Sequence, residues 1–358
     1  MKRIPALTVV VWLSGILARA QAPPLAPSVG EIDFFGLHKL NQEHILRELK
    51  LHPGDRLPAS KGDLEDRLEQ ISGVVFARVE SVCCDGNRVT LFIGIEERGA
   101  PHAGFRSDPA GNAVLPSELV DTYDRFLAAV ASAAAEGRTS EDLSAGHSLM
   151  DDPQAWAFQK RFLELAPENL KILRDVLHNG SLADQRAISA ALIGYAPKKA
   201  EVAGDLQFAL QDPNEEVRTN ALRSLTAIAV LASKQPALGL RIEPTWVVEL
   251  LNSIVLSDRV EAVKTLLALT DGAETAGHPN ARPALDLVRE RALTAVIEMA
   301  RWKTPNYALP AFLLAGRLSG MGYLDTLQQW ATGDHEAVLA KALALSASGK
   351  KKSSGTLQ

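Results

Sequence analysis

The densest group of side chains that could do chemistry lies in one short polar run. It holds four carboxylates and one imidazole within 12 residues: Glu141, Asp142, His147, Asp151 and Asp152. Such a group can hold a cation or supply a general acid and base. The same residue types also cap helices and shape exposed loops, because their oxygens accept hydrogen bonds from backbone N–H groups. We expect capping and loop roles here and keep the chemical role as the alternative.

No catalytic or metal-binding motif accompanies this run. The sequence has no G-x-S-x-G elbow, no P-loop, no H-E-x-x-H pair and no G-x-G-x-x-G after a strand. Its eight histidines show no i, i+4 pairing that would suggest a metal site. We therefore predict no catalytic residue, no metal, no cofactor and no enzymatic activity. The alternative is an enzyme or a metal-dependent envelope protein whose site lies in 141–152.

The two cysteines of the chain are neighbours, Cys83 and Cys84, and neighbours cannot close a loop that would stabilise the fold. Alternation along a strand would bury one of them and expose the other, with no specific chemistry. A strained vicinal disulfide and pairing between two chains are the other interpretations.

Composition limits the class of protein. The chain has 358 residues, 46% hydrophobic and 23% charged residues, a formal net charge of −5 and a mean hydropathy of −0.00. Its length allows two or three domains, and its apolar content excludes wholesale disorder. The acidic charge gives no indication of nucleic-acid binding.

The first residues have the pattern of a secretory signal peptide, predicted over 1–20. Lys2 and Arg3 precede an apolar stretch, 4–17, and Ala18-Arg19-Ala20 has the A-x-A form of a cleavage site. The apolar stretch is too short to span a bilayer as a helix. We expect an exported mature chain without an integral membrane span, and cleavage would make it more acidic by three charges.

A proline-rich linker, 21–28, is predicted to lead into a small module, 29–98. Asn41 and Ser60 are suitable N-cap residues for two helices, and Gly86 suits the turn of a hairpin. The predicted order is strand, helix, helix, strand, strand, over 29–37, 41–51, 60–71, 74–82 and 88–96.

This order and its turn residues resemble the POTRA domain, the polypeptide-transport-associated module of outer-membrane assembly and secretion systems. The resemblance rests on Ile32, Phe34 and Gly36, on Pro53-Gly54-Asp55, on 73–77 and on Glu96-Glu97. It implies that an edge strand pairs with a strand of a partner protein. By analogy the edge is 74–82, with Val75, Ala77, Val79 and Ser81 as the partner-binding positions.

The rest of the chain reads as a linker followed by helices. Proline and glycine are concentrated in 99–116, which predicts a domain boundary, and 117–166 is predicted as a helical cap region. Repeated helical units are then expected over 167–348, and a disordered, lysine-containing tail over 349–358.

The repeats resemble HEAT repeats of the short bacterial type. The clearest unit runs from Asp212 to Leu225, with Arg218 followed by a small residue at +3 and apolar residues at +4 and +7. Similar spacing follows Arg259 and Arg289, more loosely Arg186, and a last copy begins at Asp334. In such repeats Asp212, Arg218, Arg259 and Arg289 would pair along a structural ladder between neighbouring units. A plain amphipathic helical bundle is the alternative.

Together these features predict an α+β protein, a small βααββ POTRA-like domain followed by an all-α HEAT-like helical solenoid. The predicted function is a non-enzymatic, exported adaptor or scaffold in the periplasm of a diderm bacterium. It would bind protein partners of the cell envelope through the strand edge and the concave surface of the repeats, without nucleic acid. Self-association into a homo-oligomer is a further hypothesis.

Overall fold

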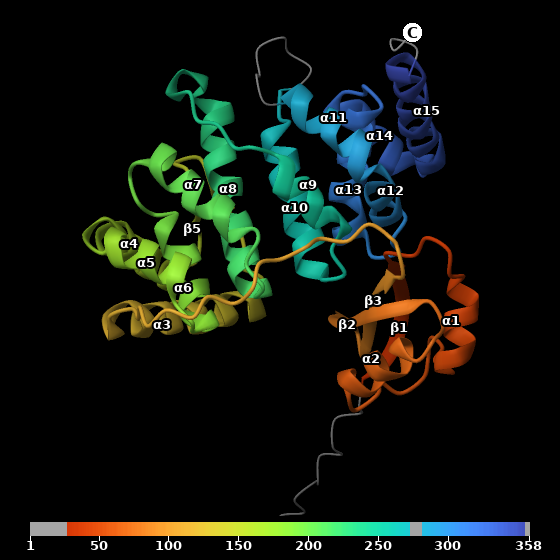
Figure 1. The fold of residues 1–358 in the computed structure, drawn as a ribbon, viewed down its shortest axis with the longest axis horizontal. Helices are drawn as coiled ribbons and strands as arrows, with labels where there is room; N and C mark the ends of the chain where they lie inside the picture. The colour runs from red at the N-terminus through yellow and green to blue at the C-terminus, as the bar shows by residue number, and fades with distance from the viewer. Residues whose placement is uncertain (1–26, 273–280, 355–358) are drawn as a thin grey trace, which may run out of the picture.

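The computed structural model describes residues 27–272 and 281–354 (Figure 1). The predicted signal peptide and residues 21–26 of the predicted linker lie outside this part, as do the side chains of Cys83 and Cys84. The fold is α+β, with a small N-terminal sheet followed by a long series of helices. Within the described residues, no helix combines the length and the apolarity needed to cross a membrane.

The N-terminal module has the predicted order of elements. Its helices begin where the sequence offers a cap: the Asn41 side chain accepts a hydrogen bond from Glu43 N, and the Ser60 side chain accepts one from Asp63 N. The strands form one sheet in the order β1-β3-β2, with β1 parallel and β2 antiparallel to the central β3. The elements are β1 Ser28–Phe35, α1 Gln42–Leu49, α2 Lys61–Glu69, β2 Val74–Asp85 and β3 Arg88–Glu97.

Both faces of this sheet are covered. Ile32 and Ile93 belong to a core that α1 and α2 close on one face. Phe35 and Phe92 point to the other face, where their rings lie 5.7 and 5.0 Å from that of Trp302. The sheet is therefore sandwiched between its own helices and the C-terminal helices, and aromatic pairs fix its position.

Helices make up the rest of the chain, and we call this part the helical stack. A short β-hairpin, β4 Glu141–Asp142 with β5 Leu149–Met150, interrupts it. Two 3-10 helices, η1 Pro236–Leu238 and η2 Leu250–Asn252, lie within it. The α-helices are α3 Ser117–Ala135, α4 Pro153–Glu168, α5 Leu170–Asn179, α6 Ala183–Ile193, α7 Lys199–Ala209, α8 Glu215–Lys234, α9 Thr245–Glu249, α10 Leu256–Leu269, α11 Ala281–Arg291, α12 Leu293–Ala300, α13 Pro305–Leu318, α14 Tyr323–Thr332 and α15 His335–Ser354.

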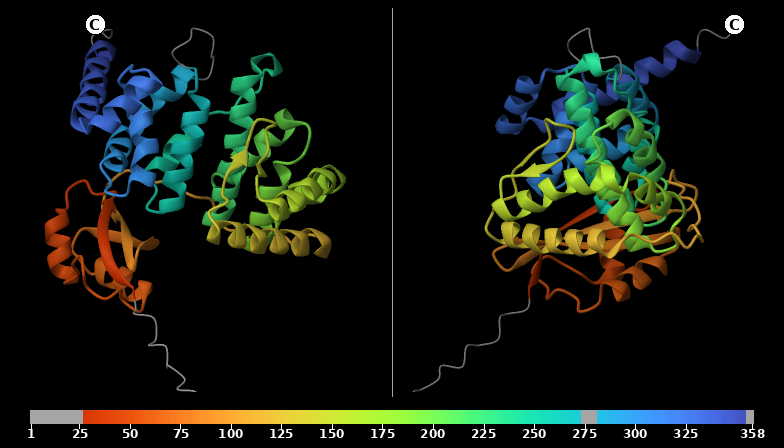
Figure 2. Two further views of the ribbon diagram at one scale, coloured as in Figure 1. Left: turned by 180° about the vertical axis from the view of Figure 1, so that it is seen from behind. Right: turned by 90° about the vertical axis from the view of Figure 1, so that its left-hand side faces the viewer.

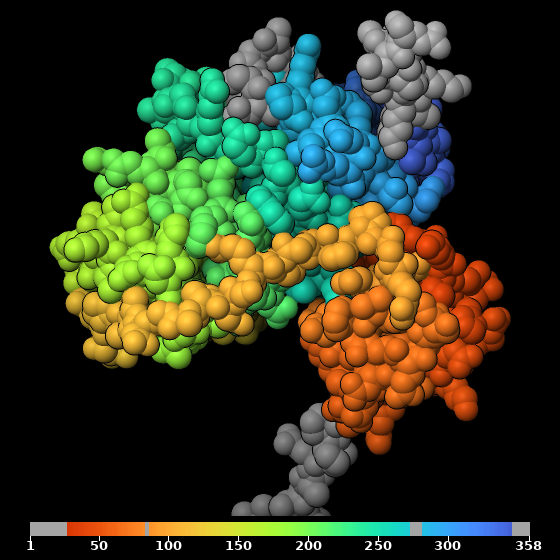
Figure 3. All heavy atoms as spheres, in the orientation of Figure 1, coloured from red at the N-terminus to blue at the C-terminus, as the bar shows by residue number. Residues whose placement is uncertain are grey.

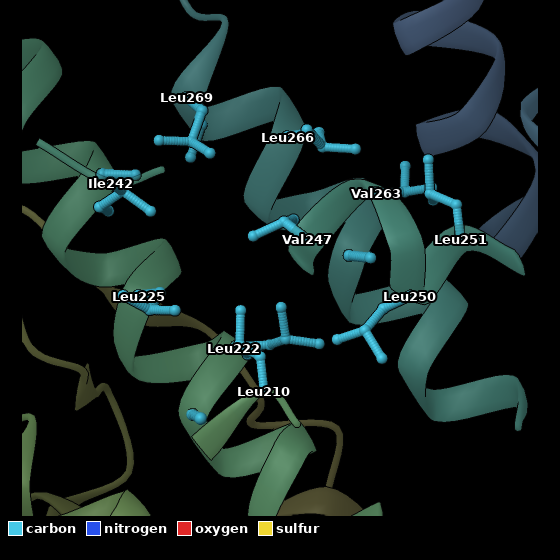
Figure 4. Close-up of a cluster of buried hydrophobic side chains, with 14 of the residues drawn as sticks. Leu210, Leu222, Leu225, Ile242, Val247, Leu250, Leu251, Val263, Leu266 and Leu269 are labelled. Atoms are coloured by element: carbon cyan, nitrogen blue, oxygen red, sulfur yellow. The ribbon is translucent and has the colours of Figure 1, made fainter. Parts of the chain in front are cut away.

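Buried aliphatic side chains join consecutive helices into one core. Figure 4 shows leucine, isoleucine and valine side chains from α7 to α10 pointing into a shared interior. No member of the stack could bury its apolar face alone, so packing on its neighbours is what stabilises each helix.

The last helix, α15, continues through Ser354, so it includes the first six residues of the segment predicted as a tail. Residues 355–358 of that segment lie outside the described part of the chain.

The segment 99–116, rich in proline and glycine, is irregular but packs closely on the stack. Arg106 N–H donates to Gln211 O at 2.9 Å, Gly111 N–H donates to Asn179 O at 2.8 Å, and Leu115 N–H donates to a glutamine side chain. Figure 3 shows the segment crossing the surface from the N-terminal module to α3. We call it the strap, because it joins the two parts and is held along its length.

Buried arginines link successive helices of the stack. Arg186 on α6 donates to both carboxylate oxygens of Asp212 at 2.9 Å. Arg218 on α8 donates in the same way to Asp258, at 2.8 to 3.1 Å. Each guanidinium also donates to the carbonyl groups five and six residues before it. The same set of hydrogen bonds thus satisfies both buried guanidinium groups, and it also fixes the distance between the neighbouring helices.

The third arginine of the series reaches the N-terminal module. Arg259 on α10 donates to Ser253 O and to Glu298 of α12, the latter at 2.9 Å. The same Glu298 oxygen accepts a hydrogen bond from Gly36 N at 3.0 Å, at the end of β1. Gly36 has φ of +80°, and a side chain there would collide with Ile95 O, so only glycine fits.

Arg289, also predicted to belong to this ladder, is more exposed than the three buried arginines, with 27% of its side chain accessible. It lies on α11, which ends at Arg291, and it donates to Asp286 and to Leu318 O. Helix α11 ends at Arg291 and α12 begins at Leu293, so the predicted spacing after Arg289 spans two helices.

Candidate binding groove

The predicted polar run folds into the β4–β5 hairpin, which crosses one face of the helical stack (Figure 2, left). The strap crosses the opposite face, the one seen in Figure 1. Between the hairpin and α3, α4, α6, α8 and α10 lies a cavity of about 470 Å³. Its apolar lining includes aliphatic side chains such as Leu127 and four aromatic rings, which belong to Tyr123, Phe126, Phe162 and Tyr195.

A buried glutamine positions the hairpin over this cavity. The Gln159 side-chain oxygen accepts a hydrogen bond from Met150 N at 2.7 Å. Its amide nitrogen donates to Ser148 Oγ and to Tyr195 Oη, both at 3.1 Å. Ser148 Oγ–H in turn donates to Glu141 Oε2 at 2.5 Å. These hydrogen bonds share Gln159 and Ser148, so they form one connected polar network on the inner side of the cavity.

The turn of the hairpin covers a buried lysine. Gly146 has φ of +77°, and a Cβ there would lie 2.8 Å from the Leu231 side chain and 3.1 Å from that of Lys199. Lys199 Nζ donates to Gly194 O at 2.5 Å. Burial lowers the pKa of Lys199 to about 8.

His147 lines the cavity beside the Tyr195 ring, with the two rings 5.6 Å apart. Burial, together with the charge of Lys199, lowers the pKa of His147 to about 4. The imidazole is therefore neutral at neutral pH and offers hydrogen-bonding nitrogens without a charge.

Charged side chains of both signs surround the mouth of the cavity. Glu141 lies 3.7 Å from the Arg223 guanidinium, and Lys264 pairs with Glu261 at 2.8 Å. Arg223 and Lys264 are about half exposed, so both can exchange these partners for those of a bound molecule. An amphipathic ligand, apolar at one end and polar at the other, suits such a site.

The other carboxylates of the polar run have structural roles. Asp152 caps α4 by accepting from Gln154 N and Ala155 N, and it pairs with Arg138 at 2.8 Å. Asp142 accepts from the N–H and the hydroxyl of a nearby serine. Asp151 is exposed and bonds to the other side of the hairpin through its own N–H. Of the five predicted residues, only Glu141 and His147 line the cavity.

A second hollow, of about 860 Å³, adjoins the first at α10. Glu261 and Lys264 line both, and the second hollow extends to Ser81 and Val82 of β2. We call the two hollows together the binding groove. It connects the predicted polar site with the end of the predicted edge strand.

The structure places β2 at an edge of the sheet. Ala77 N–H donates to Glu69 Oε1 at 3.1 Å, and Val79 N–H donates to Glu65 Oε1 at 2.8 Å. Val75 lies at an irregularity of the β2–β3 ladder, and Ser81 lines the groove. Two of the four predicted edge positions are therefore already bonded to α2.

Within the described residues, no group of three or more histidine, cysteine or acidic side chains is arranged to hold a metal ion. No protein-family model and no curated protein sequence matches the chain.

Several groove residues were missed because they lie far from the polar run in sequence. Arg223 and Lys264 belong to helices whose exposed charges look alike from sequence. Gln159 carried a usable signal, since it shares the buried stripe of α4 with Ala155 and Phe162 at spacings of four and three. A polar residue in such a stripe needs a buried partner, which here is the hairpin.

Proposed function

We propose that this protein is a non-enzymatic adaptor that binds partner proteins in the binding groove and at the β2 edge. The observation that carries the proposal is that the hairpin cavity and the hollow beside Ser81 and Val82 of β2 adjoin at Glu261 and Lys264. Strand edges and amphipathic hollows are both common sites of peptide recognition.

Two resemblances support an adaptor. The βααββ order with β2 at an edge is typical of POTRA domains, which recognise proteins through strand pairing. The paired Arg186–Asp212 and Arg218–Asp258 are what a HEAT-like α-solenoid needs between its units. We propose these family assignments for the N-terminal module and the helical stack.

The place of action follows from the sequence pattern of residues 1–20. With a signal peptide there, the mature chain would work in the periplasm, and its partners would be envelope proteins or a second copy of this chain. Those partners would meet a rigid surface, because Trp302 and Glu298 tie the N-terminal sheet to the stack.

Site-specific photo-crosslinking in the native host tests the proposal. A photoreactive residue at Lys264, which lines both hollows, or at Leu127, at the cavity, is expected to crosslink a defined protein. Lys171 and Glu290, exposed away from the groove, are the matched control positions.

The crosslinked protein is then purified and its binding to the full mature chain is measured directly. Leu127→Asp should weaken that binding, because it places a charge at the apolar side of the cavity. Equal crosslinking at groove and control positions would exclude the groove as the docking site.

An enzymatic or ligand-binding role of the cavity is the second candidate, because Glu141 and His147 both line it. Under this hypothesis Glu141→Gln and His147→Gln abolish an activity while partner crosslinking at Lys264 continues. Under the adaptor proposal no activity depends on these two residues.

A further inference from the structure

The edge of β2 is closed by carboxylates from its own domain. Ala77 and Val79 alternate with residues that bond to β3, so their N–H groups face away from the sheet. Both donate hydrogen bonds to glutamates of α2. The Ala77 N–H group donates to Glu69, and the Val79 N–H group donates to Glu65. The glutamates are four residues apart, one helical turn, and so act side by side.

We propose that Glu65 and Glu69 form a latch on the β2 edge, and that a basic, extended peptide segment opens it. The inference rests on the proposed adaptor function and adds to it the chemistry of the partner. A strand that pairs with β2 must displace both carboxylates, because one N–H group cannot serve two acceptors in line.

Displacement leaves two carboxylates beside the incoming strand without their backbone donors. A lysine or arginine of the partner strand can take over these acceptors, whereas an acidic partner adds repulsion. The other charges at this edge are Glu80, Arg78, which donates to Ala77 O, and Lys61, which lies 2.5 Å from Glu80 and 4.0 Å from Glu65. Three glutamates, at 65, 69 and 80, outnumber the two cations, so the edge is acidic, which favours a basic strand.

The latch covers the middle of the edge and leaves one end accessible. In the described part of the chain, Ser81 N–H has no carboxylate partner like those of Ala77 and Val79, and Ser81 lines the groove. A segment lying in the groove can therefore pair first at Ser81 and then displace the glutamates one after the other.

Peptide binding to the full mature chain tests the latch. Three fluorescent nine-residue peptides share one apolar alternation and carry lysine, threonine or glutamate at the other positions. Fluorescence anisotropy should rank their affinities as lysine, then threonine, then glutamate, with about tenfold between the first two, the effect of one charge-assisted bond.

Two double variants distinguish the two roles proposed for the glutamates, which are blocking the β2 edge and favouring a basic peptide. Glu65→Ala with Glu69→Ala should raise the affinity of the threonine peptide about tenfold or more and remove the preference for lysine. Glu65→Gln with Glu69→Gln keeps an acceptor oxygen, so the threonine peptide should bind as to the wild type while the lysine preference is lost. Asp66→Ala, exposed on the same helix, is the matched control.

Three results would overturn the latch. The first is equal binding of the three peptides to the wild type. The second is an unchanged affinity of the threonine peptide when Glu65 and Glu69 are both replaced by alanine. The third is self-association of this alanine double variant through its β2 edges, without peptide binding. The last would assign the glutamates to protection against self-pairing. Persistent crosslinking at Lys264 in any of these cases would leave the adaptor function standing while the latch fails.

Discussion

Glu298 and Gly36 are 262 residues apart in the chain, yet the Glu298 carboxylate accepts the Gly36 N–H hydrogen bond at 3.0 Å. The same oxygen accepts from the buried Arg259, at 2.9 Å. One carboxylate thus ends the series of buried arginines and fastens the N-terminal sheet to it. The two parts of the molecule share a polar network as well as an aromatic contact.

Glu298→Ala should uncouple the N-terminal module from the helical stack. It leaves the buried Arg259 without its carboxylate partner, which we expect to cost about 3–5 kcal/mol. In chains that keep Trp302 and carry phenylalanine at the other tryptophans, urea unfolding is followed by Trp302 fluorescence and by far-UV circular dichroism. One transition is expected with Glu298 and two with Glu298→Ala. Glu290→Ala, at an exposed position, should behave as the wild type, and coincident transitions in Glu298→Ala would contradict the coupling.

The pair Arg218 and Asp258 should be far more important for stability than exposed pairs. Asp258→Ala leaves a buried guanidinium unpaired, so the free energy of unfolding should fall by about 3–5 kcal/mol. Arg218→Met combined with Asp258→Leu should recover much of that loss, since no charge is then buried. Glu249→Ala, which breaks the exposed pair with Arg291, should cost no more than about 1 kcal/mol in the same urea experiment.

Lys199→Met should stabilise the protein at neutral pH. Burial lowers the pKa of Lys199 from 10.5 to about 8, so the unfolded chain holds this proton more tightly than the folded one. The wild type therefore gains stability as the pH rises from about 8 to about 10.5. At pH 7 the variant should be more stable by about 1–3 kcal/mol. The difference should shrink across that alkaline range, and Lys198→Met, at an exposed position, should give no such gain.

His147 should stay neutral to unusually acidic pH. Its pKa is lowered to about 4, first by burial and then by Lys199, whereas the unfolded chain titrates near 6.5. Stability that is present above pH 6.5 should therefore be lost as the pH falls toward 4. NMR titration of the imidazole measures the pKa directly, and Lys199→Met should raise it. Titration near pH 6.5 in the folded wild type would show that the hairpin does not bury the ring.

The N-terminal module was predictable because its local signals agree with its tertiary contacts. Asn41 and Ser60 cap the helices that follow them, and Gly86 forms the hairpin turn. The alternation of Ile93 and its neighbours placed one face of the sheet correctly. The other face of β3 is also buried, through Phe92. The nearly continuous apolar run of this strand indicates it, because that pattern is typical of strands covered on both faces.

The repeats and the site were predictable only in part. Residue spacing found the buried Arg218 and Arg259, but spacing does not show that a helix ends shortly after Arg289 and that a new one begins at Leu293. The polar run was found as a cluster, yet its residues divide between capping and lining the cavity. That division depends on α3, α8 and α10, which approach the hairpin only in three dimensions.

Each buried arginine of the series is contacted by a residue from the first third of the chain. Asp108 pairs with Arg186 at 3.2 Å, and the rings of Phe105 and Phe35 lie 3.9 and 4.8 Å from the guanidinium carbons of Arg218 and Arg259. Proteins built only of repeats can begin folding at any unit, because each unit contacts only its neighbours.

These contacts give the protein a higher contact order than a repeat array of the same length, so it should fold more slowly. During synthesis the N-terminal sheet emerges long before α12, and its Phe35 and Phe92 face lacks its aromatic cover until Trp302 arrives. The newly made chain therefore passes through a stage with an uncovered aromatic face, at which it is most prone to aggregate and most in need of a chaperone.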